Sequence, residues 1–173
     1  RNFKKSILKY MKKLIFLDLD GTIITTCSGK TFAEDCTDFR LRLNVLDKLV
    51  KTYPKAIYAI VTNQGGIPKY ITLQAFTAKL QSVVTFLRIY LQAPVTAAFC
   101  TSMDENNPCR KPNPGMLEQV VKQLKNKNIT IDKSDMVMIG DASGKEGNFN
   151  DSDKKTAENF GIDYIDIDDF LSK

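Results

Sequence analysis

Five short apolar runs, rich in β-branched residues, alternate along this chain with segments in which apolar residues recur at helical spacing. The runs begin at residues 14, 56, 95, 136 and 162 and read LIFL, AIYAIV, VTAAFC, MVMI and IDYIDI. Continuous apolar runs are typical of strands that are buried on both faces. Such strands, separated by helices, predict an α/β fold in which a parallel sheet has crossover helices on both faces.

The intervening segments carry helix start and stop signals. Residues 72–91 form one apolar stripe, with Thr72 as the expected N-cap. Asn113 and Pro114 predict the cap and first turn of a second helix. A third helix is expected over residues 152–160, because Gly161 stands in the usual stopping position.

The length and the charge of the chain limit its organisation. With 173 residues and 43% hydrophobic composition, the chain can bury one core but not two ordinary ones. We therefore expect a basic N-terminal arm over residues 1–13 and a single domain over residues 14–173. The arm holds six basic residues and no acidic one, and it fits either a nucleic-acid contact or a disordered tail. The net charge of +5 favours anionic partners.

The sequence gives no sign of a membrane protein or of a disulfide framework. No apolar run approaches the roughly 18 residues that a membrane span needs. Four cysteines are too few for a disulfide framework in a chain of this size. We therefore expect a monomeric intracellular protein with reduced thiols and no membrane partner.

Polar residues of the kinds used in phosphate chemistry follow four of the apolar runs. Asp18 and Asp20 follow the first, Thr62 ends the second, Arg110 and Lys111 come after the third, and Asp141 follows the fourth. Functional residues of parallel sheets collect at the carboxyl ends of the strands. The active site is therefore expected where these four ends meet.

A competing signal is the Gly29-Lys30-Thr31 triplet, which could close a nucleotide-binding loop. Such a loop needs a glycine five positions before its second glycine, so that backbone N–H groups can face the phosphates. Ile24 occupies that position, and its β-branched side chain resists the required turn. We therefore reject a P-loop, and with it a kinase activity within this chain.

Several motifs resemble a known family. DLDGT resembles the first motif of the haloacid dehalogenase superfamily, and Thr62, Lys111 and Gly140-Asp141 follow in the order of its other motifs. Within that superfamily, DLDGTIITTCSGKTF, VTNQGGI, CRKPNPGM, GDASGK and NDSDKKTAENFGI resemble the 3'-phosphatase domain of polynucleotide kinase-phosphatases. The resemblance implies a Rossmann-like, haloacid dehalogenase-like sheet. No large cap domain is expected, because segments 23–40 and 67–72 are too short to form one.

The resemblance also implies catalytic roles. Asp18 would be the nucleophile that forms a phospho-aspartyl intermediate, and Asp20 would protonate the leaving hydroxyl and then activate water. Thr62 would hold the phosphoryl oxygens, and Lys111 would offset the charge on Asp18. Further substrate contacts are expected from Leu19, Asn63, Lys30 and Arg110.

The cofactor implied by the resemblance is Mg²⁺, a hard ion that prefers oxygen ligands. Its site would use Asp18, Asp20 through its carbonyl, Asp141 and Asp153. Asp151 is an alternative to Asp153 for the last of these acids, or else it caps the helix together with Ser152.

The implied substrate is DNA that ends in a 3'-phosphate, with a kinase or a ligase as a further partner. One alternative is a small-molecule phosphatase of the histidinol-phosphate or heptose-bisphosphate branch. That branch carries a zinc loop of three cysteines and one histidine, whereas this chain offers Cys100 and Cys109 and no histidine. The other alternative is a non-catalytic module that binds nucleic-acid ends, which has no need of two neighbouring carboxylates.

Overall fold

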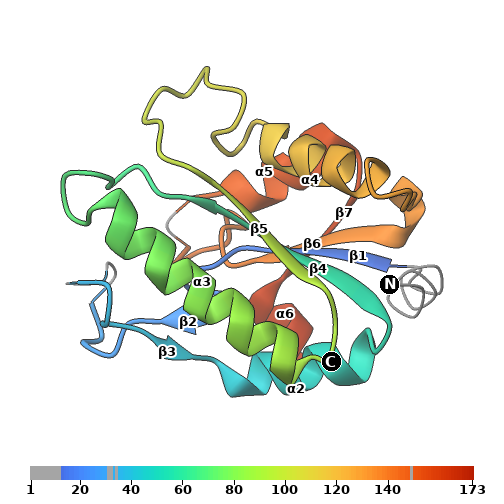
Figure 1. The fold of residues 1–173 in the computed structure, drawn as a ribbon, viewed down its shortest axis with the longest axis horizontal. Helices are drawn as coiled ribbons and strands as arrows, with labels where there is room; N and C mark the ends of the chain where they lie inside the picture. The colour runs from blue at the N-terminus through green and yellow to red at the C-terminus, as the bar shows by residue number, and fades with distance from the viewer. Residues whose placement is uncertain (1–12, 31–32, 34, 149) are drawn as a thin grey trace.

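The protein is represented by a computed structural model that describes residues 13–30, 33, 35–148 and 150–173. Its centre is a five-stranded sheet with the strand order β5-β4-β1-β6-β7, in which all neighbours are parallel (Figure 1). The strands are β1 (Lys13–Leu17), β4 (Ala56–Asn63), β5 (Val95–Cys100), β6 (Met136–Gly140) and β7 (Asp163–Asp166). All five coincide with predicted runs, which confirms the α/β sheet. Residues 1–12 of the predicted arm lie outside the described residues, and Lys13 already belongs to β1.

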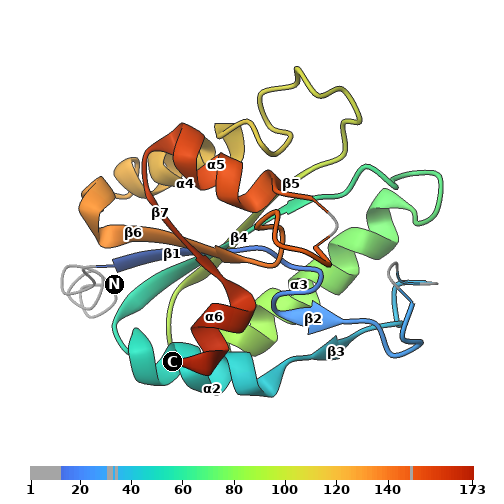
Figure 2. The same cartoon turned by 180° about the vertical axis from the view of Figure 1, so that it is seen from behind.

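Helices cover both faces of the sheet, as expected. The helices are α2 (Leu43–Thr52), α3 (Leu73–Tyr90), α4 (Gly115–Lys125), α5 (Ser152–Phe160) and α6 (Ile167–Ser172). Figures 1 and 2 show α2, α3 and α6 on one face and α4 and α5 on the other. In β1, Ile15 and Leu17 belong to the first hydrophobic core, and Leu14 and Phe16 belong to the second. Because side chains alternate along a strand, this one strand contributes to both cores.

Two of the three predicted helix boundaries are confirmed. The Thr72 hydroxyl accepts a hydrogen bond from the Ala75 backbone N–H, so Thr72 caps α3 as expected. Gly161 ends α5 with a φ of 78°, a left-handed conformation that glycine adopts without strain. The capping role of Asn113 was wrong: Pro114 occupies the cap position of α4. The Asn113 amide instead donates to the carbonyls of Glu105 and Asn107 and holds the preceding loop.

Several short elements were not predicted. Strands β2 (Ile24–Thr25) and β3 (Arg40–Leu41) pair antiparallel between β1 and α2, and a 3₁₀ turn (Lys133–Asp135) precedes β6. Ile167, which was assigned to the last strand, begins α6, because the Asp166 side chain caps that helix at the Asp168 N–H. Among the described residues, the connection from β1 to β4 contains only the β2–β3 hairpin and helix α2, which agrees with the absence of a large cap domain.

The cysteines correct one expectation. Cys100, at the end of β5, is bonded to Cys109, whereas we expected free thiols. The two Cα atoms are 5.6 Å apart because the loop after β5 turns back toward its start. Cys27 and Cys36 are free. In the part of the chain that the structure describes, no helix is long and apolar enough to cross a membrane.

Candidate active site

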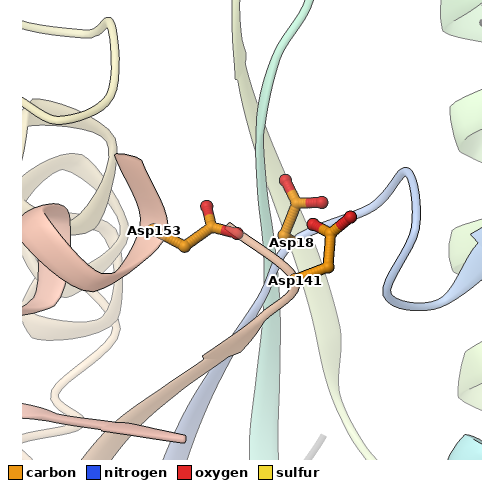
Figure 3. A group of neighbouring side chains, drawn as sticks. All are labelled: Asp18, Asp141 and Asp153. Carbon is orange, nitrogen blue, oxygen red and sulfur yellow. The ribbon is translucent and has the colours of Figure 1, made fainter. Parts of the chain in front are cut away.

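Three carboxylates meet where β1 and β6 end and α5 begins. Asp18 follows β1, and its backbone N–H donates to the Ile139 carbonyl of β6 at 3.0 Å. Asp141 follows β6, and Asp153 lies in the first turn of α5. Each carboxylate offers an oxygen within 4.8 Å of the other two (Figure 3). The parallel topology thus brings Asp18 to Asp141 and Asp153, which lie more than a hundred positions later in the sequence.

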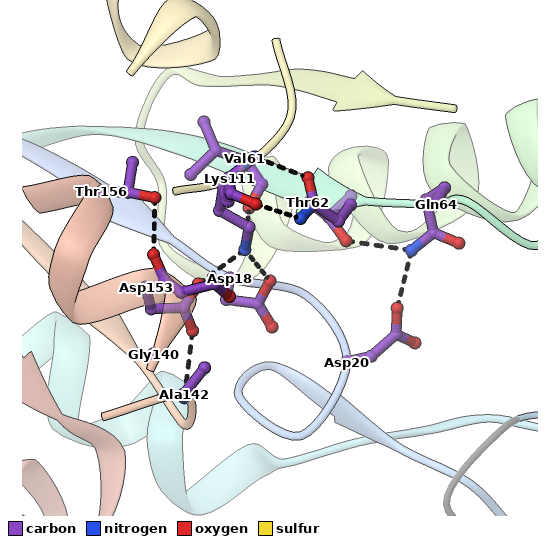
Figure 4. Close-up of polar contacts among 12 residues, drawn as sticks. Asp18, Asp20, Val61, Thr62, Gln64, Lys111, Gly140, Ala142, Asp153 and Thr156 are labelled. Atoms are coloured by element: carbon purple, nitrogen blue, oxygen red, sulfur yellow. Dashed lines mark hydrogen bonds and ion pairs between the residues drawn. The ribbon is translucent and has the colours of Figure 1, made fainter. Parts of the chain in front are cut away.

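Lys111 is the cation of this group. Its side chain is 3% exposed, and its Nζ lies 2.6 Å from an oxygen of Asp18, 2.6 Å from one of Asp153 and 3.1 Å from the Val61 carbonyl (Figure 4). Burial alone lowers the pKa of Lys111, but Asp153 and Asp18 outweigh it and raise the pKa above its ordinary value. Lys111 therefore stays charged, and it is held between the two acids.

Asn63, the last residue of β4, fixes the backbone that carries Lys111. Its amide donates to the Lys111 carbonyl at 3.0 Å and accepts from the Lys111 N–H at 3.0 Å. The Lys111–Pro112 peptide bond is cis. The predicted substrate contact of Asn63 is untested, but in this structure its side chain is engaged with the Lys111 loop.

The charges of the group do not balance. Asp18, Asp141 and Asp153 face one buried ammonium, that of Lys111. Burial raises the pKa of Asp18, with Lys111 acting in the opposite direction. Burial, reinforced by Asp153, raises the pKa of Asp141 to about 6. Surplus negative charge on closely spaced carboxylate oxygens suits a hard divalent cation.

Asp20 lies apart from this cluster and has partners of its own. One of its oxygens accepts a hydrogen bond from the Gln64 amide at 2.7 Å, and the other lies 3.8 Å from the Lys79 ammonium. Gln64 also donates to the Thr62 hydroxyl at 2.9 Å, so it links Asp20 to the end of β4 (Figure 4). The Asp20 carboxylate lies outside the three-acid group, and the expected contact of the Asp20 carbonyl with a metal ion stays a prediction.

Two glycines permit the close approach of the acids. A Cβ on Gly21 would lie 2.0 Å from a carboxylate oxygen of Asp141, and one on Gly140 would lie 2.2 Å from an oxygen of Asp153. Gly21 also has a φ of 82°, which favours glycine on backbone grounds. The Arg42 guanidinium donates to the Gly21 carbonyl and braces the loop that carries Asp20.

The structure distinguishes between the two candidates for the last acid. Asp153 is buried; one of its oxygens bonds Lys111, and the other accepts from the Ala142 N–H. The Asp151 side chain is 43% exposed and pairs with Lys155 at 2.7 Å. Asp151 stands at the cap position of α5, but its side chain makes no capping hydrogen bond there. Geometry therefore places Asp153 in the site.

The remaining expected substrate contacts are dispersed. Leu19 is fully buried, and its carbonyl accepts from the N–H groups of Ile23 and Ile24. Arg110 donates to the Ser102 carbonyl at 2.8 Å within the loop that the disulfide closes. Lys30 is exposed, in the connection between β2 and β3, and its backbone contacts Ser28 and Thr26.

Sequence reasoning missed the roles of Gln64 and Lys79. Gln64 stands two positions after Thr62, so an extended chain directs both side chains to the same side. Lys79 falls on the apolar stripe of α3, three residues after Phe76, where a charged side chain is unexpected. A basic residue within a buried helical stripe was the available signal.

Comparison with known proteins identifies the family of this chain. The family model described as polynucleotide kinase 3 phosphatase matches residues 13–171. The bifunctional polynucleotide phosphatase/kinase of Schizosaccharomyces pombe is 34% identical over 167 residues, which cover 95% of this chain but 38% of that protein. The D-glycero-beta-D-manno-heptose-1,7-bisphosphate 7-phosphatase of Haemophilus influenzae is 31% identical over 142 residues, covering 76% of this chain and 72% of that protein.

A solved structure supports the fold. The structure of D,D-heptose 1,7-bisphosphate phosphatase from B. bronchiseptica, complexed with magnesium and phosphate, superimposes with a TM-score of 0.67 at 20% identity. The match covers 88% of this chain and 78% of that one. The five-stranded parallel sheet with helices on both faces is thus a fold that this chain shares with solved phosphatase structures. The chain belongs to the polynucleotide kinase 3 phosphatase family.

Proposed function

We propose that this chain is a magnesium-dependent phosphomonoesterase that removes the terminal 3'-phosphate from DNA. The observation that carries the proposal is the pairing of Asp18 with the buried ammonium of Lys111, with a second carboxylate, Asp20, held separately by Gln64. In this proposal one carboxylate attacks, and the other remains available for proton transfer. Membership of the polynucleotide phosphatase family supports a phosphate ester as the substrate.

In the first half of the reaction, a carboxylate oxygen of Asp18 forms a bond to phosphorus while the bond to the 3'-oxygen breaks. Asp20 gives its proton to that leaving oxygen. Lys111 stabilises the negative charge on Asp18 and on the phosphoryl oxygens, and the Thr62 hydroxyl donates to one of those oxygens.

In the second half, water attacks the phospho-aspartate and Asp20 accepts its proton. Phosphate then leaves, and the carboxylate of Asp18 is restored. Asp153 takes no part in bond making, because its oxygens are used to hold Lys111 and the Ala142 N–H.

The donor set fits Mg²⁺. Asp18 and Asp141, together with the Asp20 carbonyl, would hold the ion, and Asp153 would orient Lys111 beside it. When bound, Mg²⁺ neutralises charge on the phosphoryl group and aligns it with the attacking carboxylate. The excess of carboxylates over cations is the structural observation that supports this assignment.

A strand end is the favoured substrate because, in the described part of the chain, the connection from β1 to β4 holds a short hairpin and helix α2 and no cap domain. The likeness to the Haemophilus enzyme favours a second candidate, a sugar-phosphate phosphatase. The cysteines argue against the zinc loop of that branch, since Cys100 and Cys109 are bonded to each other and the chain has no histidine. Because the Schizosaccharomyces relative is bifunctional, a kinase is the proposed companion activity, and a ligase would act on the resulting 3'-hydroxyl.

The test is a substrate panel assayed with Mg²⁺ at matched low salt. It compares oligonucleotides carrying a 3'-phosphate or a 5'-phosphate with histidinol phosphate and heptose 1,7-bisphosphate. We expect the 3'-phosphorylated oligonucleotide to have the highest kcat/KM. Equal turnover of a small phosphate would reject the polynucleotide substrate, and failure to hydrolyse any ester would favour a non-catalytic end-binding module.

A further inference from the structure

The side chain of Lys79 is a buried cation outside the three-acid cluster. It projects from α3, is 5% exposed, and lies with its Nζ 5.3 Å from the centre of the Phe39 ring. An ammonium that leaves water needs compensation, and a cation over an aromatic face is compensated only in part. Among the described residues, its one ion-pair partner is Asp20, at 3.8 Å.

Asp20 is the member of this pair that faces solvent. Its side chain is 51% exposed, whereas that of Lys79 is 5% exposed. Gln64 donates to one oxygen at 2.7 Å, and Lys79 lies 3.8 Å from the other, beyond the usual range of a direct hydrogen bond. Both oxygens of Asp20 are therefore oriented, one by a hydrogen bond and the other by charge.

A half-exposed carboxylate on a loop samples several rotamers unless partners restrain it. Gln64 is anchored to Thr62 at the end of β4, and Lys79 is anchored to the core by α3. In Figure 4, Asp20 and Gln64 lie on the side of Asp18 away from Asp153. The arrangement restrains Asp20 without using the cation that neutralises Asp18.

We infer that Lys79 is a positioning residue, which holds the Asp20 carboxylate at the leaving-group oxygen of the substrate. This inference rests on the proposed function, in which Asp20 transfers the proton. The ammonium of Lys79 acts through Asp20, and its aromatic contact with Phe39 fixes its own position. A purely structural role, in which Lys79 only fills space under α3, is the alternative to be tested.

The test exploits the need of the leaving group for a proton. The alcohol released from a 3'-phosphorylated oligonucleotide must be protonated, whereas the phenolate released from 4-nitrophenyl phosphate leaves without a proton. The parameter kcat/KM includes only the steps through formation of the phospho-enzyme. Loss of Asp20 positioning therefore lowers kcat/KM for the oligonucleotide and spares it for the aryl ester.

The variants are Lys79→Met, which keeps the length and apolar stem, and Lys79→Arg, which keeps the charge. Lys125→Met, at an exposed position of α4, is the matched control. We expect Lys79→Met to lower kcat/KM for the oligonucleotide by at least about tenfold, because general acid catalysis contributes at least that much to the rate. The kcat/KM of this variant for 4-nitrophenyl phosphate should stay within about twofold of the wild-type value. Lys79→Arg should retain most of the wild-type kcat/KM for the oligonucleotide, and Lys125→Met should resemble the wild type on both esters.

Two further variants separate positioning from folding. In an Asp20→Asn background, Lys79→Met should cause no additional loss, because the group that it positions is already gone. Phe39→Leu, which removes the aromatic contact of the ammonium, should give a smaller loss with the same dependence on the leaving group, even if Lys79→Met does not fold. Equal losses on both esters, or no loss on either, would overturn the inference.

The wild-type protein separates this inference from the proposed function. If the wild type hydrolyses neither ester with Mg²⁺, the proposed function fails. If it hydrolyses both and the Lys79 and Phe39 variants do not distinguish between them, the function stands and only the positioning role fails.

Discussion

The three N–H donors of Lys111 have three acceptors within 3.1 Å: Asp18, Asp153 and the Val61 carbonyl. The side chain is therefore fixed in position before any phosphate arrives. Such preorganisation matters because donors that already point to the developing charge need no rearrangement during the reaction. Asp18 is the only one of these three acceptors to which the proposed mechanism assigns bond formation.

The first prediction follows from this distinction. Asp18→Asn retains the shape of the side chain, and Lys111 keeps Asp153 and Val61, so the fold should survive. The attacking charge is lost, and kcat should fall on the order of a thousandfold or more. Steady-state rates and a thermal melt measure the two effects. Asp151→Asn, at an acid outside the three-acid group, is the control that should retain activity. Substantial turnover by Asp18→Asn would exclude the covalent mechanism.

The second prediction concerns Asp141, whose pKa rises from 3.8 to about 6 because of burial and the neighbouring Asp153. Between these pH values the folded protein holds a proton that the unfolded chain releases. Without metal, this group therefore reduces stability as pH rises from about 4 to about 6, and the full penalty persists above that range. Asp141→Asn should consequently raise the Tm of the chelated protein at pH 8 by a few degrees.

At pH 4, close to the unfolded pKa of 3.8, only a small part of this penalty has developed, so the same substitution should have a much smaller effect on Tm. Mg²⁺ should raise the Tm of the wild type at pH 8, since it compensates the acidic cluster, and should raise that of Asp141→Asn less. Thermal unfolding with a chelator and with Mg²⁺ measures these differences. An equal Mg²⁺ response in both proteins would remove Asp141 from the metal site.

At the scale of elements, burial explains what the sequence could predict. The five sheet strands lie between helices, so their sequences are continuous apolar runs, and all five were predicted. By contrast, β2 and β3 have two residues each and no periodicity to detect. Helix α6 was merged into the preceding strand because IDYIDI continues the apolar pattern while Asp166 already caps the helix.

The site residues likewise divide into those that the sequence could place and those that only packing could place. Asp18, Thr62, Lys111 and Asp141 could be placed at one edge of the sheet, because the carboxyl ends of parallel strands must share an edge. Sequence order could not establish that Asp20 turns toward Lys79 on α3, since that contact depends on how the helix packs. The choice between Asp151 and Asp153 likewise depended on which face of α5 is buried, and the alignment of motifs alone left it open.

The third prediction concerns the loop that precedes Lys111. The Cys100–Cys109 bond closes this loop across a sequence separation of 9 residues. Thiol titration of the denatured, unreduced protein should find two free thiols, those of Cys27 and Cys36. Cys100→Ser with Cys109→Ser should lower the free energy of unfolding by about 2–3 kcal/mol, the value for closing a loop of this size. Four titratable thiols would restore the original expectation of reduced cysteines.

On the scale of the whole molecule, the position of the site follows from the order of the strands. From β1 the chain proceeds through β4 to β5 at one edge, and it then returns to β6 on the other side of β1. The direction of winding therefore reverses beside β1, and a crevice is expected where the connections diverge. Asp18 and Asp141 follow the two strands, β1 and β6, that flank this reversal.

The last prediction tests whether the molecule contacts a strand beyond its terminal phosphate. The chain has a net charge of +5, and each phosphate of a single strand that it neutralises adds about −0.7 to the slope of log affinity against log salt. An oligonucleotide should therefore exceed a small alkyl phosphate in kcat/KM by orders of magnitude at low salt, and this ratio should shrink as salt rises. Rates on a length series of 3'-phosphorylated oligonucleotides, at several salt concentrations, measure both effects. The small alkyl phosphate serves as the reference, because salt effects on the chemical step itself change both substrates alike. If the ratio of the two kcat/KM values did not change with salt, the protein would recognise only the terminal phosphate.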